Sequence, residues 1–390
     1  MLTKTCATLF LTLAAGLGAV DAADAAVRYD FRPVSAEMQA FVDTNALDGA
    51  SLRVDKAGTV VYRAAFGGYT TGTRVPIASG SKWLSGLTVA RLVDKGLMRW
   101  SDTVGQYFPT APADKKPITL AQLFSHTSGL PDTDNLCMSN PRITLGDCAN
   151  TILANSTLIG APGTVFAYGG NSMQVAGRMA EIAAGKAWDD IFIEQTATPL
   201  GLAQTDYAYD STVAGYVRMA NPRIAEGGRS TLEDCGHVVD MLLADGRYNG
   251  KVFLSSATLA TMSIDRTVGA QNLSRPPYTD GFGYGIGHWI DSAKDPDATA
   301  LVISSPGAFG FTPWVDYGSG VAGVLLVKDQ RFKLVPDIDE IRATVNAVTT
   351  PSSGLYLAAP SSALPVADKT TPAAVARPRG AVDPATNRRR

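Results

Sequence analysis

Hydrophobic residues recur at helical spacing near the start of the chain and alternate along the segment that follows. In SAEMQAFVDTNAL, residues 35–47, the large apolar side chains fall on one face, which predicts an amphipathic helix. Residues 51–67 alternate between apolar and polar on either side of a short turn at 56–58, which predicts a β-hairpin. The apolar run 83–95 then predicts a buried helix, ended by Gly96 just beyond its last turn.

Residues 101–214 have a different pattern, with short helical segments separated by turns rich in proline and glycine. Thr119 and Gln122 have the spacing of a capping box, in which each side chain bonds the other residue's backbone amide. Gly185 and Gly201 stand where two of these helices should end. We therefore expect a helical subdomain inserted after the helix at 83–95.

The last third of the chain combines one long helix with strands. Ser230 and Glu233 form a second capping-box pattern, which predicts that a helix begins there and continues to about residue 246. Strand-like segments and a last helix follow, each bounded by turn residues. The four strands are expected within 282–290, 300–307, 311–318 and 320–329, and the helix within 337–348.

A helix and hairpin at the start, with strands and a helix at the end, predict one sheet built from both ends of the chain. The fold class is therefore α/β (α+β): an antiparallel sheet flanked by helices, with an all-helical subdomain inserted. We expect one domain over residues 27–349, whose α/β part is 27–100 and 215–349 and whose helical part is 101–214.

Both ends of the chain differ from this domain. Residues 1–25 have a positive start, a short apolar stretch and small residues before Ala22 and Ala25, which is typical of a secretory signal peptide. Residues 350–390 are rich in alanine and proline and predict a disordered tail. We expect an exported protein, periplasmic or secreted, with no membrane insertion after signal cleavage.

Composition narrows the classes of partner. The chain has 390 residues, 45% hydrophobic and 18% charged, with a formal net charge of −2. This balance allows a sizeable core and gives no basic footprint for nucleic acid. The three histidines (126, 237 and 288) are far apart in sequence and lack ligand spacing, so no metal and no cofactor is expected. The expected partner is a small molecule, and the sequence leaves the oligomeric state open.

The expected export of the protein makes a disulfide possible, because disulfides form outside the reducing cytoplasm. Cys137 and Cys148 lie in one polar loop, and a disulfide between them would stabilise the fold by roughly 3 kcal/mol in the chain-entropy model. The alternative is a pair of free thiols. Cys235 falls on the apolar face of the helix predicted from residue 230, so a buried, unreactive thiol is expected.

Candidate chemistry begins with VPIASGSKWLSG, residues 75–86, where Ser79 and Lys82 are three positions apart. A serine at the start of a helix lies in the positive field of the first amides, which stabilises an alkoxide or oxyanion. Lys82 would lie one turn further on the same face, within reach of the hydroxyl. Its amine must be neutral to act as a base, which requires desolvation among the apolar neighbours. The alternative is an ordinary capping serine beside a solvated lysine.

Two further segments add candidate groups. Tyr168 follows the strand-like TVFA and precedes Gly169, Gly170 and a helix, a junction where a phenol could share a proton with a lysine. The alternative is a merely packed tyrosine. In SSPGAFGFTPWVD a Pro-Gly break interrupts a strand, where backbone amides can face a cleft. An oxyanion hole needs two such donors, and we pair the amides of Ser79 and Ala308.

Other serine-hydrolase arrangements find no support. No serine has glycine at both −2 and +2, so the nucleophile elbow of α/β-hydrolases is absent from the sequence. Three isolated histidines give little basis for a Ser-His-Asp triad.

The segments, in this order, resemble the serine β-lactamase and penicillin-binding-protein superfamily. The resemblance is nearest to the branch of class C β-lactamases, D,D-peptidases and β-lactamase-like esterases, and it covers residues 30 to about 345. The segments that carry it are IASGSKWLSGLTVARLVDKGLMRWSDTVGQYFP, ITLAQLFSHTSGLPD, PGTVFAYGGNSMQVAGRMAE, EGGRSTLEDCGHVVDMLLADGRYNGKVFLSS and SPGAFGFTPWVDYGSGVAGVLLV.

The resemblance implies a role for each matching residue. Ser79 would be the acylated nucleophile, and Lys82 its proton acceptor or the charge that favours an ionised Tyr168. Tyr168 would be the general base of acylation and the acid for the leaving group. Ser125 and His126, in the second segment, would be structural, a helix end and a loop anchor.

Two departures concern substrate binding. Many members have Tyr-x-Asn, whereas this chain has Tyr168 followed by Gly169 and Gly170, with Asn171 one residue late. β-Lactamases place lysine or histidine before the third-motif glycine, where this chain has Ser305-Pro306-Gly307. We expect the substrate-binding positions to be Gly170, Asn171, Ser305 and Gly307, without the cation that binds a substrate carboxylate.

The sequence therefore predicts an exported serine hydrolase that works through an acyl-enzyme on Ser79, with a small ester as substrate. A D-aminopeptidase, D,D-peptidase or amidase with weak β-lactamase activity is the enzymatic alternative. A non-catalytic module that binds cell-wall peptides is the alternative of a different class.

Overall fold

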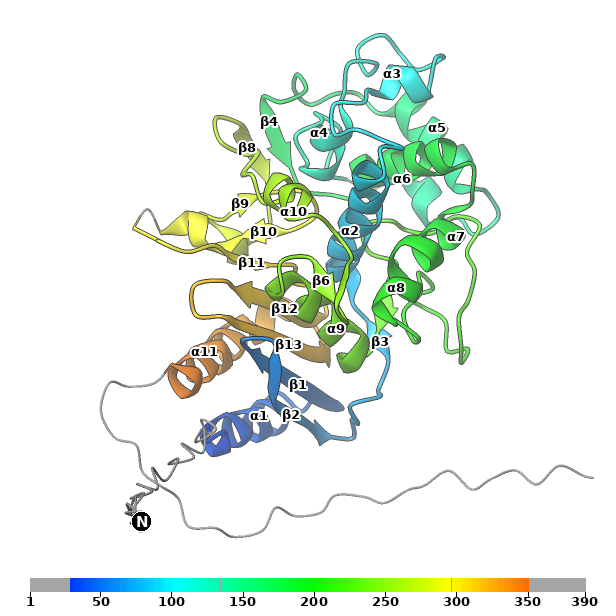
Figure 1. Cartoon of the computed structure of the whole chain (residues 1–390). Coiled ribbons are helices and arrows are strands. Elements are labelled where there is room, and N and C mark those ends of the chain that lie inside the picture. The colour runs from blue at the N-terminus through cyan, green and yellow to red at the C-terminus, as the bar shows by residue number, and fades with distance from the viewer. Residues whose placement is uncertain (1–28, 134, 296, 351–390) are drawn as a thin grey trace, which may run out of the picture. The chain divides into compact units, whose positions relative to one another are not determined.

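The computed structural model describes residues 29–133, 135–295 and 297–350 (Figure 1). The predicted signal peptide at 1–25 lies outside the described residues, as does the predicted tail beyond residue 350. The α/β class expected from the sequence is confirmed, because helices flank an antiparallel sheet.

The sheet has seven strands in the order β2-β1-β13-β12-β11-β10-β9, so strands from both ends of the chain meet in its middle. The predicted hairpin is present: its turn places Ala57 at φ +49° and Gly58 at φ +79°. The first strand pairs with the last, and Val54 lies opposite Gly323. The strands are β1 (Gly49–Lys56), β2 (Thr59–Gly67), β9 (Gly283–Tyr284), β10 (Trp289–Ile290), β11 (Val302–Ser304), β12 (Gly310–Asp316) and β13 (Val321–Lys328).

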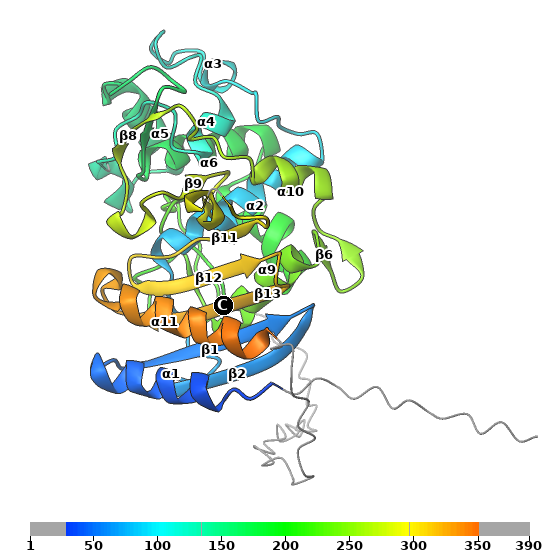
Figure 2. The same cartoon turned by 90° about the vertical axis from the view of Figure 1, so that its left-hand side faces the viewer.

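Helices cover both faces of the sheet. Helix α1 (Arg32–Thr44) and helix α11 (Arg331–Thr349) lie side by side across one face (Figure 2). Helix α9 (Leu232–Leu243) packs against β1, β12 and β13 from the other face. Helix α11 begins six residues earlier than predicted and carries Pro336 inside it, within its second turn.

The predicted cap of α9 is wrong by one residue. Thr231, rather than Ser230, is the N-cap, and its hydroxyl accepts a hydrogen bond from the amide of Asp234. Ser230 is instead part of a short strand pair and shares a hydrogen bond with the hydroxyl of Thr205. Glu233 forms ion pairs with Arg53 of β1 and Arg63 of β2. These tertiary contacts replace the local capping-box bond that the sequence predicts for Glu233.

The helical part follows the buried helix α2 (Ser81–Asp94), which ends before Gly96 as predicted. The capping box of Thr119 and Gln122 is present. Its helices are α3 (Val104–Tyr107), α4 (Leu120–Phe124), α5 (Leu145–Asn155), α6 (Asn171–Ala184), α7 (Trp188–Phe192), the π-helical turn η3 (Ile193–Ala197) and α8 (Thr198–Leu200), with the 3-10 turn η2 (Leu136–Ser139) between α4 and α5.

Short strands and turns complete the chain. Strand β4 (Val165–Ala167) pairs in parallel with β8 (Gln271–Ser274), a partner that the sequence pattern did not predict. The remaining elements are β3 (Val75–Pro76), β5 (Arg229–Ser230), β6 (Arg247–Tyr248), β7 (Lys251–Val252), α10 (Ser256–Met262) and the 3-10 turns η1 (Ala78–Gly80), η4 (Pro277–Thr279) and η5 (Asp291–Lys294).

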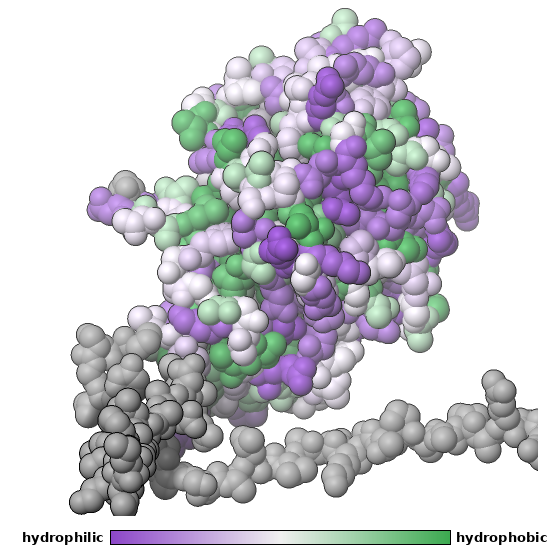
Figure 3. All heavy atoms as spheres, in the orientation of Figure 1, coloured by the Kyte–Doolittle hydropathy of each residue, from purple (hydrophilic) through white to green (hydrophobic). Residues whose placement is uncertain are grey.

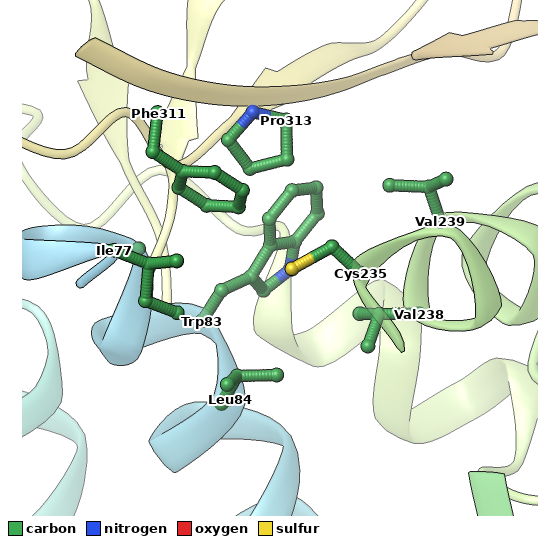
Figure 4. A pocket seen from close by; sticks show the side chains of 9 residues that line it. Ile77, Trp83, Leu84, Cys235, Val238, Val239, Phe311 and Pro313 are labelled. Carbon is green, nitrogen blue, oxygen red and sulfur yellow. The ribbon is translucent and has the colours of Figure 1, made fainter. Parts of the chain in front are cut away.

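Helix α2 lies where the sheet and the helical part meet. Most of its side chains are buried, including polar ones such as Ser85 and Thr88. The indole of Trp83 lies among Phe311 and Pro313 of β12 and Cys235 of α9 (Figure 4). Only a cavity of about 10 Å³ remains among these residues. The start of α2 is therefore fixed by close packing against the sheet and α9.

Cys137 and Cys148 form the disulfide that was predicted from the sequence. Cys235 is a buried free thiol, and burial raises its pKa to about 12. Among the described residues, the helices are too short or too polar to cross a membrane. Hydrophobic residues are dispersed among hydrophilic ones over the face seen in Figure 3.

Gly323 gives a direct test of packing in the sheet. A Cβ built at Gly323 would lie 2.2 Å from the indole of Trp314, which is itself 1% exposed. We expect Gly323→Ala to lower the free energy of unfolding by about 1–3 kcal/mol, because the ring must move in a close-packed core. Urea denaturation followed by circular dichroism measures this change.

Gly72→Ala is the matched control, since its Cβ would meet nothing closer than 3.8 Å. Its free energy of unfolding should change by less than about 0.5 kcal/mol. Equal effects of the two substitutions would contradict the packing of Trp314 over Gly323.

Candidate active site

The nucleophile candidate Ser79 lies in the 3-10 turn η1, immediately before helix α2. The prediction that Ser79 begins the α-helix is therefore wrong by two residues, since α2 begins at Ser81. Ala78, the first residue of this turn, has φ +44°, which lies outside the right-handed helical region. Ser79 is half-buried and lies just before the first amides of α2, where the helix field favours negative charge.

Lys82 is almost completely buried, with 2% of its surface exposed. Its amine lies 3.2 Å from the Oγ of Ser79, which confirms that the two side chains meet. The same Nζ donates to the carbonyl of Ala225, also at 3.2 Å. Burial of an amine is costly unless partners replace water, and these two oxygens supply that replacement.

Tyr168 lies at the junction of β4 and α6, with the Nζ of Lys82 4.5 Å from the centre of its ring. The ring stacks on Trp289, with centroids 5.0 Å apart, and meets Tyr284 edge-on at 5.8 Å. Tyr284 and Trp289 are each 1% exposed, so they form a rigid support beneath Tyr168. Burial, followed by the proximity of Tyr168, raises the pKa of Tyr284 well above its usual range, which keeps this phenol neutral.

The third candidate segment connects β11 to β12 and lies against the nucleophile turn. The hydroxyl of Ser305 donates to the carbonyl of Ser79 at 3.4 Å. A Cβ at Gly307 would lie 2.1 Å from the carbonyl oxygen of Ile77, so only glycine fits there. Ala308 follows at an exposed position, within a turn closed by the hydrogen bond from the amide of Gly310 to the carbonyl of Gly307. The oxyanion hole of Ser79 and Ala308 stays a prediction.

Gly170 and Asn171 mark the start of α6, beside Tyr168. The side chain of Asn171 is 1% exposed and donates to the carbonyls of Pro131 and Thr133, while its oxygen accepts from the amide of Asn135. These three hydrogen bonds hold the loop that passes over Gly169. In the structure the Asn171 side-chain amide is hydrogen-bonded to this loop. The substrate contacts expected from the sequence stay predictions for Gly170, Asn171, Ser305 and Gly307.

His126 lies directly behind Tyr168, with ring centroids 4.7 Å apart. The residue is 1% exposed and has φ +58°. Neither ring nitrogen has a hydrogen-bond partner among the described residues. Burial, and then the charge of Lys82, hold the pKa of His126 well below its usual value, so the imidazole is neutral. Its backbone carbonyl accepts from the amide of Ala167, consistent with the structural anchor expected from the sequence.

Sequence reasoning assigned no role to Ala225 or Gly228 in the segment at 225–228. Ala225 contributes only its backbone carbonyl to Lys82, and no side-chain pattern identifies such a contact. No role was predicted for Ser81 either, although it is a polar residue beside Lys82 at the start of a helix.

The arrangement can perform acyl transfer. A hydroxyl within hydrogen-bond distance of a buried amine can lose its proton as it attacks a carbonyl. The described residues include no cluster of three or more histidine, cysteine or acidic side chains placed to hold a metal ion.

This fold, with its serine and buried lysine at the start of a helix, is that of a β-lactamase-like serine hydrolase. The chain belongs to the beta-lactamase family, whose profile matches residues 34–346. It is 27% identical over 250 residues to penicillin-binding protein 4 of Amycolatopsis lactamdurans, a match that covers 62% of this chain and 62% of that protein.

Solved structures share this fold. A putative beta-lactamase from Bacteroides dorei is 29% identical, with a TM-score of 0.71 over 82% of this chain and 99% of that one. A family VIII carboxylesterase shares the fold at 18% identity, with a TM-score of 0.61 over 80% of this chain and 97% of that one.

The buried histidines predict a characteristic response to pH. Burial lowers the pKa of His288 to about 4, and the pKa of His126 also lies well below that of an exposed histidine. Both imidazoles should therefore remain neutral at pH 5, as read from the ring resonances of ¹⁵N-histidine-labelled protein. A resonance of either residue that titrates near pH 6.5 would contradict this burial.

The same shifts affect stability. The unfolded chain binds protons on these histidines below about pH 6.5, whereas the folded chain does not, so stability falls as pH falls. For His288 this is a loss of up to about 1.4 kcal/mol per pH unit between about pH 6.5 and pH 4, and the lowered pKa of His126 acts in the same direction. Substituting His288 by Gln should reduce this slope in denaturation measured at several pH values.

Proposed function

We propose that this protein is a serine carboxylesterase that hydrolyses small neutral esters through an acyl-enzyme on Ser79. The observation that carries the proposal is the 3.2 Å contact between Ser79 Oγ and the Nζ of the buried Lys82, with Tyr168 beside it. In the resting geometry Lys82 donates to Ser79, and it becomes an acceptor for the serine proton when its amine is neutral.

Acylation then proceeds by ordinary carbonyl chemistry. Ser79 Oγ bonds to the ester carbonyl carbon while its proton passes to the Lys82–Tyr168 pair. The carbonyl π electrons move to the oxygen, which the amides of Ser79 and Ala308 would stabilise. Collapse of this intermediate expels the alkoxide, which takes up the proton, and water later releases the acid by the same route.

The preference for a neutral ester rests on the third segment. From Ser304 to Gly310 the chain carries no charged side chain, and Ser305 bonds the Ser79 carbonyl. A substrate carboxylate would find no cation in this segment, so a β-lactam or a peptide C-terminus would lose that ion pair. A carboxylesterase with the same fold supports the view that this scaffold accommodates ester hydrolysis.

The proposal is tested by release of p-nitrophenol from p-nitrophenyl butyrate. We expect turnover by the wild type that is lost in Ser79→Ala and falls at least 10³-fold in kcat for Lys82→Ala, since the proton acceptor is then missing. Hydrolysis of the β-lactam nitrocefin should be far slower than that of the ester.

Two other outcomes would redirect the proposal. Labelling of Ser79 by a fluorophosphonate without ester turnover would favour the amidase or peptidase alternative. Absence of both turnover and labelling in a folded protein would favour the non-catalytic binding module.

We also infer that the protein is exported. The disulfide between Cys137 and Cys148 is typical of proteins that fold outside the reducing cytoplasm. Expression of the full chain in a bacterium should yield a periplasmic or secreted form whose first residue follows Ala22 or Ala25, as read by mass spectrometry. An uncleaved chain retained in the cytoplasm would contradict export.

A further inference from the structure

The turn that presents Ser79 contains a residue in a strained conformation. Ala78 has φ +44°, a left-handed value that is unfavourable for an L-residue with a Cβ. Such a conformation persists only where surrounding contacts enforce it. The contacts around Ala78 therefore determine the direction in which the next residue, Ser79, presents its hydroxyl and its amide.

Ser81 makes the contacts that enforce this turn. Its side chain is completely buried, and its Oγ donates to the carbonyl of Ala78 at 2.5 Å. The same Oγ accepts a hydrogen bond from the amide of Gly228 at 2.8 Å. One hydroxyl therefore connects the strained residue to a segment about 150 positions later in the chain.

The segment at 225–228 holds the other side of the same turn. The amide of Ile77 donates to the carbonyl of Gly228 at 2.9 Å, so Ile77 and Ser81 both bind Gly228. A Cβ at Gly228 would lie 2.7 Å from the Oγ of Ser81, which explains why glycine stands there. Three residues earlier, Ala225 accepts the hydrogen bond of the Lys82 amine.

We propose that Ser81 is a positioning residue for acyl transfer, an inference that rests on the proposed role of Ser79 as nucleophile. The hydrogen bonds of Ser81 to Ala78 and Gly228 keep Ala78 in its left-handed conformation. They thereby hold the Ser79 hydroxyl next to the Lys82 amine. Ala225, which binds the Lys82 amine, belongs to the same segment as Gly228. The segment at 225–228 therefore positions both Ser79 and Lys82, the two partners of the proton transfer. The Ser81 hydroxyl bonds Ala78 and Gly228 rather than the reacting atoms, Ser79 Oγ and Lys82 Nζ.

Ser85 provides a matched control within the same helix. It is also completely buried, and its Oγ bonds the hydroxyl of Tyr207 at 2.6 Å and donates to the carbonyl of Ile224 at 2.7 Å. Its two hydrogen bonds thus resemble those of Ser81 in number and burial, but they lie one turn further from Ser79. Removing either hydroxyl should cost stability to a similar degree, because each leaves buried groups unpaired.

The experiment compares the rate of covalent labelling by a fluorophosphonate, in which the Ser79 oxygen bonds to phosphorus, its proton passes to the Lys82–Tyr168 pair and fluoride leaves. Full-length wild type, Ser81→Ala, Ser81→Cys and Ser85→Ala are measured at a temperature where all four are folded by circular dichroism. We expect the maximal labelling rate of Ser81→Ala to fall about 10- to 100-fold with little change in half-saturating probe concentration, because the oxygen is misplaced rather than the probe site lost.

Ser81→Cys, which keeps the volume but bonds weakly, should fall between Ser81→Ala and the wild type. Ser85→Ala should label within about twofold of the wild-type rate. If Ser81→Ala does not fold, the comparison of Ser81→Cys with Ser85→Ala decides the question.

The outcomes separate this inference from the proposed function. Equal labelling rates for the Ser81 and Ser85 variants, with Ser79 still modified, would overturn the positioning role and leave the nucleophile in place. A folded wild type that is not labelled at Ser79 would overturn both.

Discussion

Burial of the Lys82 amine is the constraint on which the rest of this structure depends. The side chain is 2% exposed, and an ammonium removed from water is very unfavourable without compensating partners. Three of its contacts come from different parts of the chain: the hydroxyl of Ser79, the carbonyl of Ala225 and the ring of Tyr168. The helical part and the sheet therefore have to meet at the start of α2, since no single segment could supply all three contacts.

Backbone packed against backbone makes this meeting point rigid. The third segment approaches so closely that a Cβ at Gly307 would collide with the carbonyl of Ile77, just before the nucleophile turn. On another side, a Cβ at Gly287 would lie 2.4 Å from the carbonyl of Lys82. Beneath the turn, Trp83 fills the space between β12 and α9 (Figure 4). A hydroxyl held in this way loses little freedom when a substrate binds, and such preorganisation favours a chemical step.

Local patterns predicted those parts of the fold in which neighbouring residues decide the structure. Three such predictions are confirmed: the hairpin with its turn at 56–58, the capping box of Thr119 and the disulfide of Cys137. Each depends on spacing or turn chemistry within a few residues. The cap of α9 was wrong, because Ser230 is committed to a strand pair and to Thr205, contacts that a sequence window cannot contain. The parallel pairing of β4 with β8 joins segments about 100 residues apart and was missed for the same reason.

In the candidate site, too, the sequence predicts local contacts and does not predict tertiary ones. Ser79 and Lys82 could be chosen from their spacing because a helical turn brings positions three apart together. Tyr168 could be named as a candidate from its place between a strand-like segment and two glycines, but its pairing with Lys82 is tertiary, so its role came from the resemblance to a family. No role could be assigned to Ala225 or Gly228 from the sequence, because they act through backbone atoms, which every residue carries.

The side chain of Asn171 is committed to hydrogen bonds within the protein. With Gly169 and Gly170 before it, Asn171 becomes the first residue of α6, and its amide is used by the loop at 131–135. That loop packs on Gly169, where a Cβ would lie 2.5 Å from the carbonyl of Asp132, so the two glycines and the asparagine form one unit. In the proposed esterase, recognition next to Tyr168 would therefore come from the braced loop rather than from a free amide. Together with the uncharged third segment, this arrangement agrees with the proposed preference for a neutral ester.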